Sequence, residues 1–255
     1  MTLVYNLDFI NDKSKKSNIK RAISILEQAY YKQIEVSSFF LDPFERRVIG
    51  SIAEKNGIKI KFVGANPRAE RKIFIANPYY DDIDTSQYIR VMEFEKVEIG
   101  HPDILGALIH LGLDRNKIGD ISILEEKVEF VLLKEDAAFV KYNLFKVKRE
   151  PIAIDFKDTN MLDLIEAKYI EKSGFISSLR LDNLIGLMVN SSRKKAKDLI
   201  SKSLVKVDFQ TITDPSYKVS ESSPISIRGW GRFIFDGVSG RSKKDNYHVD
   251  YRKLI

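Results

Sequence analysis

The 255-residue sequence predicts an α+β protein built from three small domains and a basic polar tail. Helix-period and strand-period segments succeed one another, turn-rich stretches separate them, and the composition becomes basic toward the C-terminus. The predicted parts are an N-terminal α/β domain at 1–78, a four-stranded α+β domain at 87–158, a C-terminal domain of two helices on a small bent sheet at 175–241, and the tail at 242–255.

The N-terminal domain is predicted from two helices and three strands. Apolar residues recur at helical spacing over 18–32 and indicate an amphipathic helix. Asp42, Pro43 and Glu45 form a strong helix start, with Asp as the N-cap and Pro in the first turn. That helix should end at Gly57, which can adopt the left-handed geometry of a C-terminal cap. The strands are expected at 34–41, 58–63 and 72–76.

The middle domain is predicted from the order of its elements. These are a strand at 88–99, a helix at 102–111, strands at 117–124 and 128–133, a helix at 136–144 and a strand at 152–156. The order β-α-β-β-α-β is that of a ferredoxin-like plait, which RNA-recognition motifs also use. Phe94 and Phe130 lie on strands, but no aromatic pair matches the RNA-stacking signature, so we expect both in the core. A connecting helix is expected over 161–171.

The C-terminal domain is predicted from two short helices and three strands. Apolar residues from Leu181 to Met188 share one face of the first helix. Ser192 is the expected N-cap of the second helix, 193–202. The strands are expected around Val205 and Val207, Tyr217 and Val219, and Ile225 and Ile227.

The composition excludes several classes of chemistry. The chain has no cysteine, which excludes disulfides, thiolate metal sites and cysteine nucleophiles. The three histidines, His101, His110 and His248, show no metal-ligand spacing. Gly229 and Gly231 lack the third glycine and the opening helix of a dinucleotide-binding loop. We therefore expect neither a metal ion nor a cofactor.

The start of the chain and its hydropathy predict a cytoplasmic protein. Asp8 and Asp12 interrupt the apolar residues near the N-terminus, so a signal peptide is not expected. No window approaches 18 uncharged apolar residues, so no segment is expected to span a membrane. We expect a monomer without a membrane partner.

The net charge of +6 is confined to the C-terminal part. Residues 1–159 hold 25 Lys and Arg and 25 Asp and Glu, whereas residues 160–255 hold 17 and 11. Between Asn190 and Lys244 the counts are 12 and 5. A localised positive field of this kind attracts a polyanion, with nucleic acid or an anionic membrane the usual candidates. The alternative is a basic face that only keeps the protein soluble.

The start of the second C-terminal helix is the main candidate for binding RNA phosphates. The positive end of the helix macrodipole makes each Lys or Arg there unfavourable by about 0.3–1 kcal/mol. Yet Arg193, Lys194 and Lys195 follow the N-cap Ser192, and Lys197 comes close behind. Free backbone N–H groups and cationic side chains suit a phosphate. A tolerated run of surface charge is the alternative, because such penalties are small.

Two further groups of cations are candidate RNA contacts. Arg228 and Arg232 flank Trp230, the only tryptophan, between two glycines. This cluster could stack on a base or ribose, or Trp230 could fill the core under the sheet, which we favour. Lys243 and Lys244, in the expected tail, would add non-specific phosphate contacts.

Four short motifs occur in a recognisable order in the C-terminal third. They are Arg-Leu-Asp at 180–182, Ser-Arg at 192–193, Val-x-Val at 205–207 and Ile-x-Ile-Arg at 225–228. This pattern resembles the RNA-binding domain named after ribosomal small-subunit protein four, written here as the S-four domain. The resemblance implies that Arg180 joins the RNA-binding surface of the second helix. Asp182 would orient that arginine or cap its helix.

The chain departs from the S-four pattern at three turns. Such domains usually have Gly at the position of Ser203, Asn-Gly at Asp208-Phe209, and Gly-Asp near Ser222-Ser223. Ser203 must therefore accept a helix-ending geometry that glycine adopts at lower cost. We expect these changes to affect local turns and not the RNA-facing helix.

Motifs in the first two domains extend the resemblance over most of the chain. They are AERK at 69–72, HPDILGAL at 101–108, Gly-Leu at 112–113 and KIGDI at 117–121, together with RGWGRF at 228–233. These segments resemble the YlmH family of bacterial ribosome-associated proteins. Membership implies binding to the large ribosomal subunit, contacts with its ribosomal RNA and with tRNA, and a role in rescuing stalled subunits that carry peptidyl-tRNA.

Two other functions compete with this hypothesis. Arg-Leu-Asp at 180–182 echoes the catalytic loop of pseudouridine synthases, which are RNA-modifying enzymes. In that class, however, the loop lies in a large domain after the S-four module, and only 73 residues follow Asp182 here. We therefore expect no catalytic residue. The other alternative is a cell-division accessory protein whose basic face meets a membrane or a protein.

Overall fold

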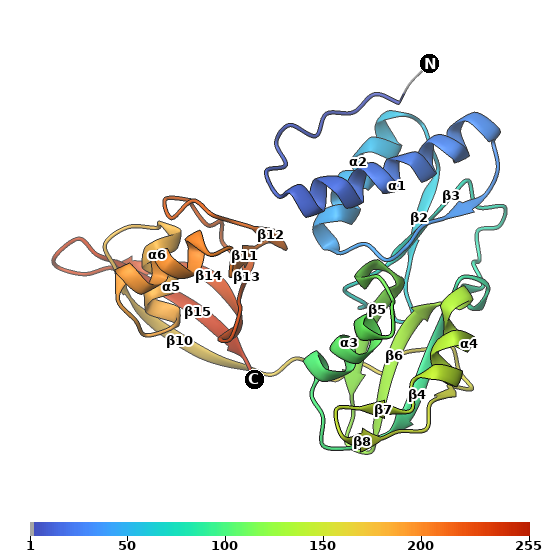
Figure 1. Cartoon of the computed structure of the whole chain (residues 1–255). Coiled ribbons are helices and arrows are strands. Elements are labelled where there is room, and N and C mark those ends of the chain that lie inside the picture. The colour runs from blue at the N-terminus through green and yellow to red at the C-terminus, as the bar shows by residue number, and fades with distance from the viewer. Residues whose placement is uncertain (1–2) are drawn as a thin grey trace. The chain divides into compact units, whose positions relative to one another are not determined.

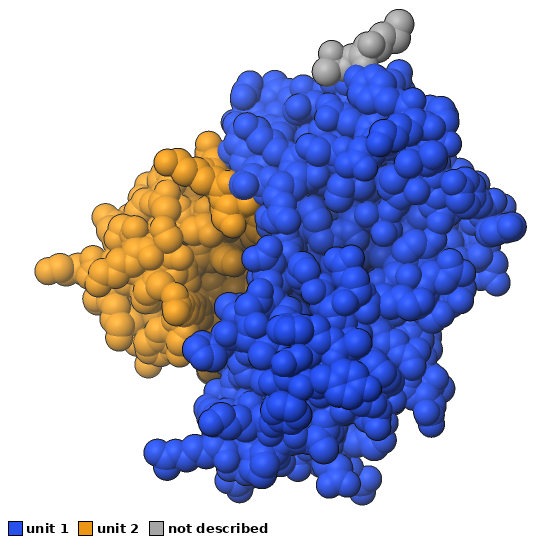
Figure 2. Space-filling model, turned by 45° about the vertical axis from the view of Figure 1, so that its right-hand side comes forward, with its two compact units in different colours: residues 1–10, 16–165 blue, residues 11–15, 166–255 orange. Residues whose placement is uncertain are grey.

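The computed structural model describes residues 3–255, so Met1 and Thr2, the first residues of the expected N-terminal domain, lie outside it. The chain forms two compact units (Figures 1 and 2). The first unit holds the residues up to Ile10 and Lys16–Ile165, and the second holds Asn11–Lys15 and Glu166–Ile255. The two predicted N-terminal domains thus share one compact unit.

The N-terminal part of the first unit has two helices and a small sheet. Helix α1 covers Lys13–Lys32 and α2 covers Pro43–Lys55. The three strands are β1 (Val36–Ser37), β2 (Ile60–Val63) and β3 (Ile73–Ala76), in the antiparallel order β1-β3-β2. The predicted cap of α2 is confirmed, because Asp42 and Glu45 make a reciprocal capping box. The strand expected at 34–41 is much shorter, and Leu41 adds only an isolated bridge to Lys72.

The middle part is a ferredoxin-like plait, as predicted. Its elements are β4 (Ile89–Glu95), α3 (His101–His110), β5 (Ile118–Ile123), β6 (Lys127–Leu133), α4 (Lys134–Asn143) and β9 (Asp155–Phe156). The antiparallel sheet has the order β5-β6-β4-β9, which places the first and third strands of the motif at its centre. A two-stranded hairpin of β7 (Lys146–Val147) and β8 (Glu150–Pro151), which was not predicted, follows α4.

Both faces of the plait's sheet are covered. On one face, Phe94 and Phe130 pack with apolar residues of α3 and α4, so the expectation that both lie in the core is confirmed. On the other face, Val91 and Val131 pack against the N-terminal sheet, including Ile73. Close approach requires the absence of a side chain at Gly119, where a Cβ would lie 2.9 Å from the Phe40 ring. This second face is the one that carries RNA-stacking aromatics in RNA-recognition motifs, and here it is buried.

The expected connecting helix over 161–171 is wrong. The backbone N–H of Leu162 donates to Ala65, and the segment runs without helix until β10 (Tyr169–Ile176). Its apolar pattern was only partial: Leu162 is buried, whereas Met161 and Ile165 are exposed. The last three residues of the predicted helix, 169–171, instead belong to β10, which pairs with a distant segment.

The second unit packs two helices on one face of a six-stranded sheet (Figure 1). The helices are α5 (Leu181–Met188) and α6 (Arg193–Ser201). The remaining strands are β11 (Val205–Val207), β12 (Gln210–Thr211), β13 (Ser223–Ile227), β14 (Gly231–Arg241) and β15 (Tyr247–Leu254). The antiparallel sheet order is β10-β15-β14-β13-β11-β12. No strand forms at Tyr217 and Val219, where Lys218 makes only an isolated bridge to Arg180.

The polar tail expected at 242–255 is instead a turn followed by a strand. Strand β15 lies between β10 and β14, and its residues Val249 and Tyr251 are buried in the core. The charged residues that made this segment look like a tail alternate with these core residues. The C-terminal domain therefore begins before the expected residue 175 and extends past 241.

Three turns keep a left-handed backbone although their residues are not glycine. The φ angles are +59° at Ser203, +48° at Asp208, +67° at Phe209 and +62° at Ser222. These are the positions at which S-four domains usually have glycine or Asn-Gly. Two consecutive positive φ values join β11 to β12, as in a tight hairpin turn. The turn shapes are thus retained, and each of these residues adopts a left-handed backbone that costs a residue with a Cβ more than it costs glycine.

Replacing Ser203 by glycine should remove strain at the end of α6. We expect Ser203→Gly to raise the free energy of unfolding of the second unit by about 0.5–1 kcal/mol. Ser201→Gly, two residues earlier in the helical region, should instead lower it by about 0.5–1 kcal/mol. Urea unfolding followed by the fluorescence of Trp230 measures both variants. A loss of stability in Ser203→Gly would contradict the assignment of strain.

Candidate nucleic-acid interface

A buried carboxylate connects the two helices of the second unit. The side chain of Asp182 has no exposed area. Arg180 donates to its two oxygens from Nε and Nη2, at 3.2 and 3.3 Å. Arg193 donates from Nε to Asp182 Oδ2 at 3.0 Å. The interpretation that Asp182 orients Arg180 therefore fits the structure, but no sequence pattern indicated that Asp182 also binds the first residue of α6.

The charge of Asp182 is stabilised by these two partners. Burial alone would raise the pKa of the Asp182 carboxyl, but the hydrogen bonds and charges of Arg180 and Arg193 hold it below its ordinary value. The arginine side chains remain partly exposed, at 36% for Arg180 and 53% for Arg193. Asp182 thus fixes the inner edge of each guanidinium and leaves donors of both facing solvent.

The start of α6 presents several cations, of which Arg193 is paired with the Asp182 carboxylate. The hydroxyl of Ser192 accepts from the backbone N–H of Lys195 at 3.3 Å, which confirms Ser192 as the N-cap. The first turn contains no acidic residue. Lys194 and Lys197 are exposed, and neither makes an ion pair with any residue between 3 and 255. The positive end of the helix and these side chains therefore add to one local field.

The turn between β13 and β14 extends this surface. Gly229 and Gly231 have φ values of +82° and +100°, which allow the tight reversal at Trp230. The Trp230 ring is half-buried against the core, and the ammonium group of Lys195 lies 5.0 Å from the ring centroid. Trp230 thus fills part of the core, as favoured, while Lys195 covers its ring. Arg228 is exposed beside it.

Three of the predicted contacts lie away from this cluster. Arg232 lies on β14 next to the inward-facing Phe233, so strand alternation points it to the face opposite the helices. Its guanidinium lies 5.6 Å from the ring centroid of Phe209. Lys243 and Lys244 lie in the turn between β14 and β15, at the other end of β14 from Trp230. These three cations therefore do not share the surface at the start of α6.

A shallow pocket beside Arg193 contains residues that the sequence did not single out. It has a volume of about 310 Å³ and is lined by Phe175, Ile176, Ser177, Asp182, Asn183, Gly186, Leu187, Ser191 and Arg193. The Phe175 side chain is 58% exposed and packs on the ring of His248, with 4.7 Å between centroids. An exposed aromatic next to a cation suits base stacking. This site was missed because no strand was predicted at Phe175, which lies beyond the helix predicted over 161–171.

The plait offers a different kind of surface from an RNA-recognition motif. Its sheet is buried on both faces, but Phe139, Tyr142 and Phe145 are exposed on and after α4. In residues 3–255, no group of three or more His, Asp and Glu side chains is arranged to hold a metal ion. The same residues include no helix long and apolar enough to cross a membrane.

Comparisons with known proteins agree with these features. A family model described as "Putative RNA-binding domain in YlmH" matches residues 87–161, and one described as "S4 domain" matches residues 179–225. The second is the S-four domain, and its match contains Arg180, Asp182 and the start of α6. The chain is thus an RNA-binding protein with a C-terminal S-four domain.

Similarity to a protein of known family establishes the family to which this chain belongs. The chain is 30% identical over 249 residues to the ribosome-associated protein quality control protein P2 of Bacillus subtilis strain 168. The match covers 94% of this chain and 96% of that protein. The chain therefore belongs to the YlmH family, as its motifs predicted. Its fold is also similar to that of the cell division protein ylmH from Streptococcus pneumoniae, with a TM-score of 0.51 and 14% identity over 60% of this chain and 95% of that chain.

Asp182 should stabilise the second unit only while it is ionised. We expect Asp182→Asn to lower the free energy of unfolding by about 1–3 kcal/mol at neutral pH. Because the folded-state pKa lies below the unfolded value of about 4, the contribution is complete above that value. It is lost as the pH falls through the folded-state pKa. Urea unfolding followed by Trp230 fluorescence across this pH range measures the difference.

The matched control is Asp198→Asn on the exposed side of α6. It should change the free energy of unfolding by less than about 0.5 kcal/mol. Equal losses in the two variants, or an Asp182→Asn defect that does not shrink in acid, would contradict the stabilising role of the Asp182 charge.

Proposed function

We propose that the chain is a non-catalytic RNA-binding factor of the bacterial ribosome, acting in the cytoplasm as a monomer. It would bind ribosomal RNA of the large subunit, and tRNA, through a basic surface made of Arg180, Ser192, Arg193, Lys194, Lys195, Lys197 and Arg228. The observation that carries this proposal is the start of α6, where Lys194 and Lys197, which make no ion pair among residues 3–255, lie beside Arg193 at a helix N-terminus. Arg232, Lys243 and Lys244 would contact phosphates outside this basic surface.

The cellular role is proposed from the relative. The name of the Bacillus subtilis protein assigns that protein to ribosome-associated protein quality control. A protein of the same family and nearly the same length is a candidate for the same process. We propose that this chain acts on large subunits stalled with peptidyl-tRNA, where ribosomal RNA and tRNA lie close together.

The structure of Asp182 supports a non-catalytic role. A catalytic aspartate must reach the base on which it acts. Asp182 is fully buried, and both of its oxygens accept hydrogen bonds from arginines. The Arg-Leu-Asp sequence therefore has a structural explanation without pseudouridine-synthase chemistry. Mass analysis of ribosomal RNA from a deletion strain tests this, since a lost modification would contradict it.

The basic surface should bind large subunits with a strong dependence on salt. Lys194→Ala and Lys197→Ala remove phosphate contacts without removing any contact within the protein, so the fold should be unchanged. Each substitution should reduce the slope of log K against log salt concentration by about 0.7–1. Co-sedimentation with purified large and small subunits over a salt series measures the slope, and a mobility-shift titration repeats it with tRNA.

The control is Lys172→Ala, which removes an exposed lysine of β10 in the same unit. It should leave the slope within about 0.3 of the unsubstituted protein. The proposal fails if the unsubstituted chain does not sediment with large subunits at low salt, or if all three variants behave alike.

A further inference from the structure

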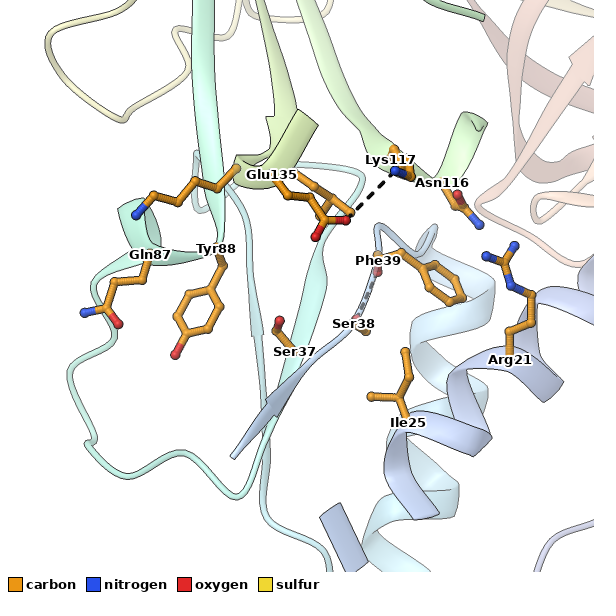
Figure 3. Close-up of a pocket in the computed structure, with 12 residues that line it drawn as sticks. Arg21, Ile25, Ser37, Ser38, Phe39, Gln87, Tyr88, Asn116, Lys117 and Glu135 are labelled. Atoms are coloured by element: carbon orange, nitrogen blue, oxygen red, sulfur yellow. Dashed lines mark hydrogen bonds and ion pairs between the residues drawn. The ribbon is translucent and has the colours of Figure 1, made fainter. Parts of the chain in front are cut away.

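A second candidate site lies in the first unit, far along the sequence from the basic surface. It is a pocket of about 470 Å³ where the N-terminal part meets the plait (Figure 3). It is lined by Arg21, Ile25, Ser37, Ser38, Phe39, Gln87, Tyr88, Asn116, Lys117, Leu133, Lys134 and Glu135. Gln87 and Tyr88 lie on one side, and Arg21, Phe39 and Asn116 lie on the other. Pockets of this volume hold ligands of the size of a nucleotide.

Asn116 is a largely buried residue whose side-chain amide no other described residue uses. The residue is 6% exposed, and its backbone carbonyl accepts from the N–H of Phe40 at 2.8 Å. Its side-chain amide makes no hydrogen bond with any residue between 3 and 255. The amide atoms still reach solvent, so a polar group of a ligand can take the place of water as their partner. The exposure that remains opens into the pocket, where a ligand can reach both the donor and the acceptor.

The charge of the pocket favours an anion. Arg21 is exposed, makes no ion pair among the described residues, and lies 5.0 Å from the ring centroid of Phe39. Lys134, the first residue of α4, is also exposed and without an ion pair there. Lys117 is already bound by Asp136 at 2.7 Å and lies 3.9 Å from Glu135. Two cations therefore remain available to an anion, Arg21 within α1 and Lys134 at the start of α4.

A nucleotide has a hydrogen-bonding base edge, a planar ring and a phosphate, and the residues of the pocket can bind each of these. The carboxamide of Asn116 offers a donor and an acceptor side by side, which matches the hydrogen-bonding edge of a base. Phe39 and the Arg21 guanidinium offer planar groups on which a base can stack. Lys134 and Arg21 can bind the phosphate. A bare phosphate would leave the amide unexplained, and an uncharged ring would leave the cations unexplained.

We propose that this pocket binds a single nucleotide, with its base edge at Asn116 and its phosphate at Arg21 and Lys134. The nucleotide can come from two sources, a free mononucleotide or an unstacked nucleotide of a bound RNA strand. The site is distinct from the basic surface, and it would give the plait a means of contacting RNA that does not use its buried sheet.

Calorimetric titration of the full chain with AMP, GMP, CMP and UMP tests the pocket directly. At least one nucleotide should bind, and ribose 5-phosphate, which lacks the base, should bind at least about tenfold more weakly. Arg21→Ala and Asn116→Asp should each weaken binding about five- to tenfold, through a lost phosphate contact and a lost donor with added negative charge. Lys20→Ala removes the neighbouring exposed cation of α1, which does not line the pocket, and should change the affinity less than twofold.

Crosslinking separates the two sources. Single-stranded RNA carrying 4-thiouridine should crosslink to residues of the pocket if the nucleotide belongs to an RNA strand. Mononucleotide binding without such a crosslink would support the free ligand instead. The absence of both mononucleotide binding and crosslinking would overturn the proposal. Equal binding of ribose 5-phosphate and the nucleotides would also overturn it.

A failure of this proposal can be told apart from a failure of the basic surface. Lys194→Ala should leave mononucleotide binding unchanged. Arg21→Ala should leave unchanged the salt dependence with which the second unit binds large subunits. Loss of mononucleotide binding in Lys194→Ala would place the nucleotide at the basic surface and overturn the pocket.

Discussion

The second unit depends on one ionic interaction, in which buried Asp182 holds Arg180 and Arg193. Each arginine begins a helix region, so a single carboxylate fixes the start of α5 relative to the start of α6. Buried ion pairs contribute little net stability, but they impose one geometry, because any other arrangement leaves a charge unpaired. Here that geometry keeps two guanidinium groups beside the lysines of α6. The cost of concentrating positive charge at a helix start is offset partly by the negative charge beneath it.

The first unit shows a different constraint, which is the burial of both faces of the plait. A fold that resembles an RNA-recognition motif has lost the surface by which such motifs bind RNA, because the N-terminal sheet packs on it. Similarity of topology therefore gives no information about the binding surface in this domain. The surfaces of the plait that remain available for binding are the pocket beside the N-terminal part and the exposed aromatic residues of α4.

Local chemistry made much of the fold predictable from sequence. The Asp42–Glu45 capping box, the alternation of the plait and the Ser192 cap each depend on residues a few positions apart. The errors have the opposite character. Strand β15 is stabilised by pairing with β10, which lies 85 positions earlier at the pair Tyr169↔Leu254, and no local pattern reveals that partner. At the candidate interface the cations of α6 were found from charge, whereas Phe175 and the link from Asp182 to Arg193 required the three-dimensional arrangement.

The position of β15 has a consequence for how the protein is made. Because β15 lies between β10 and β14, the sheet of the second unit is divided until Tyr247–Leu254 have been synthesised. During translation, β10 and the edge of β14 must wait with unpaired backbone groups while the first unit can already fold. The sheet of the second unit can therefore be completed only after Tyr247–Leu254 have been synthesised, and a nascent chain that stalls before Tyr247 would lack the strand that joins β10 to β14.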